Sequence, residues 1–592
     1  MKTVNNIFKH TFFCLALGTT VCSCDLDVEP TSSIATETFW TSEKDAWYNL
    51  NAVYSASIPG AAVHSDSYTN DAYCQYSWES NGAIYQQNGL SALYDEGYNF
   101  ETVRKQNIFL QEIENVPMDE DLKTRFKAEV RAMRAWTYLN LTTFGKVPLI
   151  TDVLSYDAPN IPRDETSKIR EFILNELTEA AAILPEKYAG SYPNEKGRMT
   201  KYAALAVKAR AALYFGDYPT AEAAAKEIMD KGGFSLFQVS ELTEAQKKEA
   251  EEMELYIDFD KYGIDRDKFM KGMFSYESLW HTENGNPDNP EYVMTRQYTA
   301  SSWDYQDMTR YTSIRPNQLG GWSSVTPTQN LVDAYWTVDG KTPSIPSIEK
   351  RMNAYKVIKG DLDEYKAPAG EAKFISFASG LINSGKLKDY EYMQEFRNRD
   401  SRLYASILFP FKGWYETNYG TNFIYEWIKN GNNESKTGFN FRKMSPLEND
   451  ANNDGQATGD YPCIRYAEVL LIFAEAHTQT TGFDGQTQAA LNQLRDRCGM
   501  PNVPTSLGKE DGLALIKNER RIELAGEGLR SDDLSRYGDA YWSAQMNNVP
   551  ISTPDGEKVI TMKWDSRMSL RPIPQTAIDL TPLRATDQNP GY

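Results

Sequence analysis

The feature that most constrains the fold is a pair of amphipathic segments at residues 200–233, with the sequence TKYAALAVKARAALYFGDYPTAEAAAKEIMDKGG. Apolar side chains recur at helical spacing on both sides of a central break; they are Tyr202, Ala206, Ala209 and Leu213, and then Ala221, Ala225 and Ile228. Gly216-Asp217 interrupts the pattern and Gly232-Gly233 ends it. The segment therefore predicts two helices joined by a tight turn, and its small alanines allow the helices to approach closely.

Such a hairpin cannot bury its own apolar face, so it predicts further hairpins in the chain. Its core, L-Y-x-G-D-Y-x-x-A, is typical of a tetratricopeptide hairpin, although the signature is incomplete and an ordinary helical pair is the alternative. Helical segments are expected at about residues 42–58, 101–143, 165–232, 461–500 and 510–538. Residues 59–100 and 234–460 have no clean period and read as loops, turns and short strands.

The N-terminal residues 1–23 have the features of a cleaved leader. Lys2 and Lys9 precede the apolar run FFCLALGTTV, which is too short to span a bilayer. The following Val21-Cys22-Ser23-Cys24 resembles a bacterial lipobox, which predicts cleavage before Cys24 and a lipid on its thiol. An ordinary secretory leader with a nearby cysteine is the alternative. A lipidated Cys24 would hold the chain on a membrane, because more than one acyl chain gives stable anchoring.

The composition argues against several partners. The formal net charge is −20, and it becomes −22 once the two lysines of the leader are removed. This charge disfavours nucleic acids and anionic membrane surfaces as partners. Aromatic residues make up 12% of the chain, including 36 Tyr and 12 Trp. Their rings offer flat apolar faces with a polar edge, which suits the C–H faces of sugars, although most such rings simply fill a large core.

Two aromatic groups in the irregular regions are candidate ligand contacts. The first is Tyr73, Tyr76 and Trp78 with the amide of Asn81, and the second is Tyr298, Trp303, Tyr305 and Trp322. Rings beside amides form a plausible sugar-binding surface, since the rings stack on the sugar and amides bond its hydroxyls. The alternative is that these loops only cover the core.

Catalytic and metal signals are weak. Asp450, Asn452 and Asp454 match the opening of a calcium loop, but Tyr461 stands where the bidentate Glu should be, so a polar turn is favoured. The chain has only four histidines, which limits zinc or Ser–His–Asp chemistry. Glu519, Glu523 and Glu527 recur every four residues among arginines. Acid/base catalysis is one reading of this row; a buried ion network is favoured, because like charges at this spacing repel unless they are neutralised. No cofactor is expected.

Taken together, several segments resemble the SusD/RagB family of outer-membrane lipoproteins. The most specific are N-E-R-R-I-E-L-A-G-E-G-L-R-S-D-D-L-S-R-Y and the final LRPIPQTAIDL and QNPGY. FWTSEKDA, A-E-x-R-A-x-R-A-W-x-Y-L with F-G-K-V-P-L, ALYFGDYPTAEAAAKEI, PTQNLVDAYWTVDGK and IRYAEVLLIFAEA also match. The chain departs from the family where Gly526, Ser531 and Asp532 stand, since aromatic residues are often found there.

The resemblance implies a mainly α-helical protein in which about four tetratricopeptide-like hairpins form a right-handed scaffold with a large irregular insertion. It implies one SusD-like domain over residues 24–592, exposed on the cell surface and anchored to the outer membrane through Cys24. It also implies a non-catalytic protein that binds oligosaccharides and delivers them to a TonB-dependent, SusC-like transporter.

Other functions stay open. The chain could be a scaffold or lid for the transporter, with a peptide or another nutrient as ligand. A surface glycosidase is a further alternative, which would need a carboxylate pair across a cleft. The sequence singles out no such pair among its 82 acidic residues.

Overall fold

Helices dominate the computed structural model of this chain, whose description covers residues 40–60, 62–155, 161–188, 195–281, 284–298, 321–369, 380–381, 384–414, 423–444, 459–580 and 587–592. Cys24, Trp303, Tyr305, Asp450, Asn452 and Asp454 lie outside these ranges, so the anchor, part of the second aromatic group and the calcium-like loop remain predictions. Within the described ranges, no helix is both long enough and apolar enough to cross a bilayer, and no three His, Cys, Asp or Glu side chains gather as metal ligands would.

Most helices near the two ends of the chain fall into an N-terminal series and a C-terminal series. The first comprises α2 (Glu43–Ser57), α5 (Glu101–Glu112), α6 (Glu120–Leu141), α7 (Thr166–Ile183), α8 (Lys201–Phe215) and α9 (Tyr218–Lys231). The second comprises α19 (Tyr466–Thr480), α20 (Gly485–Arg497), α21 (Lys509–Glu523), α22 (Arg530–Tyr537), α23 (Asp539–Met546) and α24 (Gln575–Leu580). Between the two series lie α10 (Glu244–Glu252), α11 (Phe259–Tyr262), α12 (Arg266–Ser278), α14 (Gln329–Ala334), α15 (Ile348–Ala369), α17 (Glu391–Gln394) and α18 (Ser401–Ser406).

The hairpin predicted at residues 200–233 is present as α8 and α9. The side chain of Thr200 caps α8 by accepting from the N–H of Ala203, and Asp217 caps α9 by accepting from Thr220. Between the helices Gly216 adopts a left-handed conformation (φ 75°), which a glycine reaches without strain. Because α8 consists largely of alanine, it fits between α7, α9 and α19 with most of its side chains buried.

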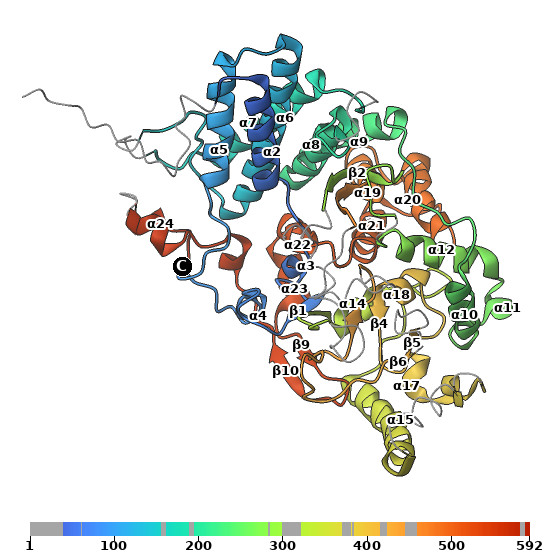
Figure 1. Cartoon of the computed structure of the whole chain (residues 1–592). Coiled ribbons are helices and arrows are strands. Elements are labelled where there is room, and N and C mark those ends of the chain that lie inside the picture. The colour runs from blue at the N-terminus through green and yellow to red at the C-terminus, as the bar shows by residue number, and fades with distance from the viewer. Residues whose placement is uncertain are drawn as a thin grey trace, which may run out of the picture.

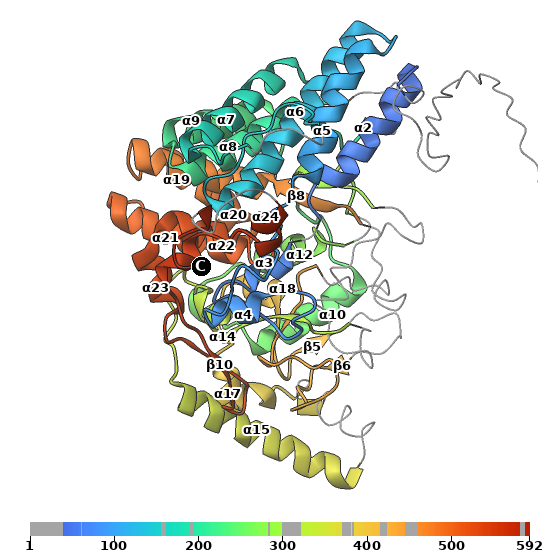
Figure 2. The same ribbon diagram turned by 90° about the vertical axis from the view of Figure 1, so that its left-hand side faces the viewer.

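The N-terminal helices and α19–α21 form one side of the molecule, and the irregular segments form the other. Helices α2 and α5 to α9 lie side by side, while α15 projects at the opposite end (Figures 1 and 2). One large apolar core fills the helical side, and a second, rich in Phe and Tyr, fills the loop-rich side. A smaller core, which includes Tyr85 and Trp542, lies near the C-terminal helices. This arrangement confirms the mainly α-helical prediction.

The strands are short and pair two at a time, always antiparallel. The pairs are β1 (Ala72–Cys74) with β3 (Val325–Pro327), β2 (Tyr292–Arg296) with β8 (Tyr461–Arg465), β4 (Ile407–Leu408) with β7 (Asn440–Phe441), β5 (Gly413–Trp414) with β6 (Phe423–Ile424), and β9 (Pro550–Ser552) with β10 (Lys558–Thr561). Except for β5–β6 and β9–β10, each pair joins segments on either side of a long connection. The β1–β3 pair brings residue 73 opposite residue 326.

A buried charge network joins the helical side to the loop-rich side. It consists of Arg402, Lys443, Arg465, Arg495, Arg497, Glu291, Asp400, Glu519, Glu523 and Glu527, all of which are almost fully buried. Arg465 makes three ion pairs, with Glu291 (2.8 Å), Glu523 (2.8 Å) and Glu527 (2.7 Å). Arg402 similarly bonds Asp400, Glu519 and Glu523 at 2.7–2.9 Å. The carboxylate row on and after α21 is therefore neutralised, as the ion-network interpretation predicted.

The pKa shifts of the network side chains agree with these ion pairs. Burial alone would raise the pKa of Glu523, but Arg497, Arg465 and Arg402 hold it far below its usual range. Burial also lowers the pKa of Lys443 to about 8, even though its ammonium bonds Glu527 at 2.7 Å. Each buried charge thus depends on its partners, because an unpaired charge away from water is costly.

A second polar contact joins three scaffold helices. His477 on α19 lies between two carboxylates, with Nδ1 2.7 Å from Glu222 of α9 and Nε2 3.1 Å from Asp484, the cap of α20. Burial opposes protonation of the imidazole, but the two carboxylates outweigh it and raise the pKa of His477 above its ordinary value of 6.5. The carboxylates in turn have lowered pKa values, so all three groups favour their charged forms.

We expect Arg465→Met to lower the free energy of unfolding by about 3–5 kcal/mol, because it leaves three buried carboxylates without their shared partner. Urea denaturation at pH 7 measures the change. The matched control is Lys247→Ala, which breaks an exposed pair with Glu244 and should change stability little. An Arg465→Met variant as stable as the control would contradict a structural role for the network.

We expect His477→Gln to be more destabilising at pH 5.5 than at pH 8.5. A raised folded pKa contributes stability that is fully present below the unfolded value of about 6.5 and is lost as the pH rises through the folded value. The difference in denaturation midpoint between variant and parent, followed from pH 5.5 to 8.5, measures this effect. A difference that stays constant over this range would show that the imidazolium does not stabilise the scaffold.

Candidate ligand-binding site

The turn that follows β1 carries a pair of stacked aromatic rings, of which Tyr76 is half-buried and Trp78 is exposed. Tyr76 and Trp78 have ring centroids 4.6 Å apart and planes inclined by 22°. The Trp78 side chain is 76% exposed, which is unusual for so large an apolar ring. The Tyr76 hydroxyl donates to Oδ1 of Asn433 at 2.7 Å, so the ring of Tyr76 is fixed. We call Tyr76 and Trp78 the aromatic platform.

Three segments that are distant in sequence meet beside the platform. The β1–β3 pairing places the turn after residue 74 next to residues 322–325, and the N–H of Gln75 donates to the carbonyl of Ser324 at 2.9 Å. The side-chain amide of Gln75 then donates to the carbonyls of Ser323 (2.7 Å), Glu434 (3.2 Å) and Trp322 (3.4 Å). One amide group therefore ties together the platform turn, the loop before β3 and the 433–434 turn.

Trp322 is the member of the second aromatic group that lies in this assembly. It is half-buried, and its carbonyl accepts from Gln75. The structure thus brings the backbone of Trp322 to the turn that carries Tyr76 and Trp78, although the sequence placed these residues in separate candidate groups.

The remaining described candidates lie elsewhere or are engaged within the protein. Tyr73 lies on β1 and packs half-buried against the small C-terminal core. Asn81 donates from Nδ2 to Glu96 at 2.8 Å, and Glu96 also accepts from Tyr68. Tyr298 lies after β2, where its N–H donates to Asp460. A direct ligand contact by any of these three stays a prediction.

Sequence reasoning missed two residues that hold the platform in place. Gln75 and Asn433 carry no motif, and the bond from Tyr76 to Asn433 spans 357 positions in the chain. Asn433 adopts a positive φ of 50°, which asparagine tolerates better than most residues. A run of Asn and Gly at residues 430–433 is the only local signal, and it predicts a turn rather than a contact.

A flat ring pair with carbonyl and amide groups around it can stack on a sugar ring and bond its hydroxyls. The carboxylates in the two turns are engaged within the protein: Oε1 of Glu434 accepts from Tyr425 at 2.9 Å, and Glu79 lies 3.9 Å from His64. The geometry therefore favours recognition of a neutral, hydroxylated ligand with an apolar face.

Comparison with known proteins identifies relatives over nearly the whole chain. The sequence model of the SusD family matches residues 290–592, and a model described as starch-binding associating with outer membrane matches residues 26–213. The SusD-like protein P38 of Formosa agariphila is 24% identical over 563 residues, which cover 91% of this chain and 93% of that protein.

Solved structures share the fold. A SusD-like protein from Bacteroides fragilis superposes with a TM-score of 0.71 at 24% identity, and the match covers 94% of this chain and 99% of that one. A second B. fragilis protein, described as a SusD-like carbohydrate binding protein, gives a TM-score of 0.67 at 22% identity and covers 92% of this chain and all of that one. At these identities the likeness establishes the fold.

We expect Gln75→Met to destabilise the protein by about 1–3 kcal/mol, because three partly buried carbonyls lose a shared donor while the side chain keeps its length. Thermal and urea denaturation measure the change. Gln87→Met is the control, since the amide of Gln87 bonds only the exposed turn of its own helix. Equal stability of the two variants would show that Gln75 does not hold the three segments together.

Proposed function

Since this chain belongs to the SusD family, we propose that it binds oligosaccharides on the aromatic platform and passes them to an outer-membrane transporter, without catalysing a reaction. The observation that carries the proposal is the exposed ring of Trp78 stacked on Tyr76, whose hydroxyl bonds Asn433, on a turn that Gln75 ties to neighbouring segments. Such a preformed surface binds with little loss of conformational entropy. The description of one relative as a carbohydrate binding protein supports the ligand class.

The proposed assembly also uses the lipid predicted on Cys24 and the helical scaffold. A lipid on Cys24 would tether the protein to the outer membrane, in keeping with the outer-membrane association named for the family model that matches residues 26–213. The helices α5 to α9 offer a rigid wall for a TonB-dependent, SusC-like partner. In this proposal Trp303 and Tyr305 also contact the oligosaccharide.

The charged groups support a binding role over a hydrolytic one. The carboxylate row on α21 is held in ion pairs with arginines, so these carboxylates are not available as a catalytic acid and base. Release of reducing ends from a polysaccharide by the purified protein would revive the glycosidase alternative.

We expect Trp78→Ala to weaken oligosaccharide binding by about 1–3 kcal/mol, the range found when a stacking ring is removed under a planar ligand. Because the ring is exposed, thermal stability should stay unchanged. Calorimetric titration against a panel of neutral glycans measures the affinity. Tyr48→Ala is the control, since Tyr48 is an exposed aromatic residue on α2, remote from the platform in sequence.

Loss of binding in both variants, or in neither, would overturn the assignment of the platform. If no glycan binds the parent protein but a peptide or another nutrient does, the ligand class of the proposal is wrong, and the scaffold role with a different ligand takes its place.

A further inference from the structure

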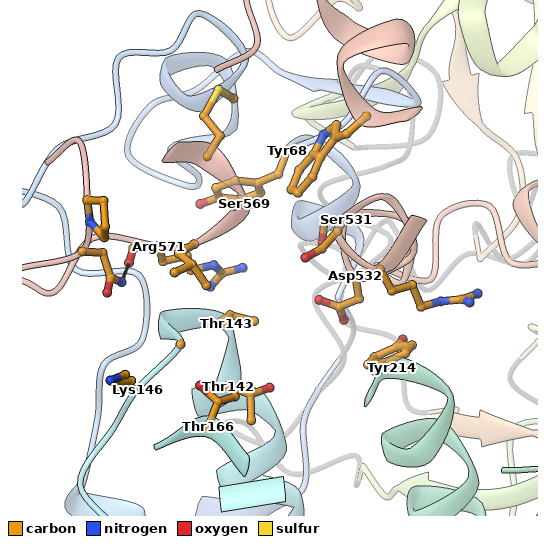
Figure 3. A pocket seen from close by; sticks show the side chains of 18 of the residues that line it. Tyr68, Thr142, Thr143, Lys146, Thr166, Tyr214, Ser531, Asp532, Ser569 and Arg571 are labelled. Atoms are coloured by element: carbon orange, nitrogen blue, oxygen red, sulfur yellow. Dashed lines mark hydrogen bonds between the residues drawn. The ribbon is translucent and has the colours of Figure 1, made fainter. Parts of the chain in front are cut away.

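A second cavity, separate from the platform, lies between the helical scaffold and the C-terminal tail. It has a volume of about 620 Å³, which suits a small organic ligand. Its walls come from the turn after α6, the end of α8, the start of α22 and the segments 568–571 and 588–590 (Figure 3). We call it the Asp532 pocket, after the acidic residue that lines it.

The charge of the pocket is opposite to that of the chain. Five basic side chains line it, with Asp532 as the one acidic lining residue that the structure describes, whereas the whole chain carries a net charge of −20. Electrostatics therefore favour an anionic ligand group over a cationic one.

Three of the five cations bond other side chains of the protein. Arg536 pairs with Glu475 and Asp533, and Lys146 pairs with Glu165. Arg163 donates to the side chain of Asn589 at 3.2 Å.

The other two cations, Arg571 and Arg170, bond no side chain in the described part of the chain, and like Arg163 they have no ion pair there. Arg571 donates one N–H to the carbonyl of Glu96 at 2.8 Å and lies over the ring of Tyr68, 5.4 Å from its centroid. Arg170 lies 5.0 Å from the ring centroid of Phe215, and burial lowers its pKa. Each guanidinium still has donors for a carboxylate.

Two oxygen groups in the pocket likewise lack hydrogen-bond partners among the described residues. The Tyr214 hydroxyl is buried without a partner. The Asp532 carboxyl accepts no hydrogen bond there, and burial raises its pKa to about 6, although Arg571 opposes this shift. Figure 3 shows Arg571 and Asp532 pointing toward one another across the cavity, with Tyr214 beside Asp532. A buried polar group is normally satisfied, so the Tyr214 hydroxyl suits a ligand that brings its own hydroxyls, and the half-buried Asp532 carboxyl is open to the same ligand.

The two arginines and the two oxygen groups together suit a ligand that carries both a carboxylate and hydroxyl groups. A carboxylate would pair with Arg571 or Arg170, and hydroxyls would donate to Asp532 and bond Tyr214 and Ser531. The rings of Tyr68 and Trp542 offer apolar contact to a C–H face. A neutral sugar would leave the arginines unpaired, and an ammonium group would meet five cations.

We propose that the Asp532 pocket is a second saccharide site, selective for a sugar acid such as a single uronic acid residue. The site uses none of the platform residues, so it stands or falls separately from the proposed function.

The test is calorimetric titration of the purified full-length chain with methyl β-D-glucuronide at pH 7. Methyl β-D-glucoside keeps the ring without the charge, propionate keeps the charge without the ring, and glycylglycine is a zwitterion. We expect saturable binding of the glucuronide and at least about tenfold weaker binding of the other three, because a charge-assisted pair adds roughly this factor.

Variants then locate the site. Arg571→Gln should weaken glucuronide binding about tenfold or more, and Asp532→Asn and Tyr214→Phe by about three- to tenfold, from the loss of single hydrogen bonds. Tyr214→Phe keeps the ring in place, so it remains informative if Arg571→Gln fails to fold. Lys247→Gln, at an exposed lysine of α10 that does not line the pocket, should bind the glucuronide as the parent does, and so should Trp78→Ala.

The proposal is overturned if the glucuronide does not bind, if the glucoside or glycylglycine binds equally well, or if Tyr214→Phe and Asp532→Asn leave the affinity unchanged. It is also overturned if Trp78→Ala abolishes glucuronide binding, which would place the sugar acid on the platform. Loss of neutral-glycan binding in Trp78→Ala with glucuronide binding retained supports both sites.

Discussion

The buried charge network is the interaction on which the arrangement of this protein depends. Arg402 and Lys443 come from the loop-rich side, while Arg495, Arg497 and the carboxylates of α21 come from the helical side. Burying such charges is costly, and the cost is offset only when every partner is in place. The two apolar cores must therefore dock in this arrangement for all of these buried charges to be paired.

The two proposed binding surfaces depend on that docking. Strand β8 carries Arg465 and pairs with β2, so the segment that follows Glu291 is fixed to the scaffold. On the loop-rich side, β1–β3 and the amide of Gln75 then hold the platform turn against residues 322–323 and 434. The Asp532 pocket forms where the C-terminal tail returns to the turn after α6, with Asn589 donating to the carbonyl of Phe144. Loops without regular structure are thus positioned by a rigid helical frame.

How much the sequence could predict depended on how local each signal was. The α8–α9 hairpin was predictable because periodicity and the Gly216 turn are local. The spacing of Glu519 and Glu523 with neighbouring arginines also indicated an ion network, but not its partners Asp400 and Glu291, which are distant in the chain. The platform was identified in part: Tyr76 and Trp78 stood out as aromatic residues, whereas Tyr73 turned toward the core and Gln75 and Asn433 carried no signal. Ser531 and Asp532 were noted only as departures from the family pattern, and their place in a pocket depends on the tail packing over them.

The central claim is that the loop-rich side presents a preformed glycan surface held by the scaffold. The most direct measurement is a crystal structure of the chain with a bound neutral oligosaccharide. The account predicts a sugar ring stacked on Trp78, with the backbone of residues 72–78 and 322–327 displaced by less than about 1 Å from the free protein. A sugar bound away from Trp78, or a rearranged β1–β3 pair, would contradict it.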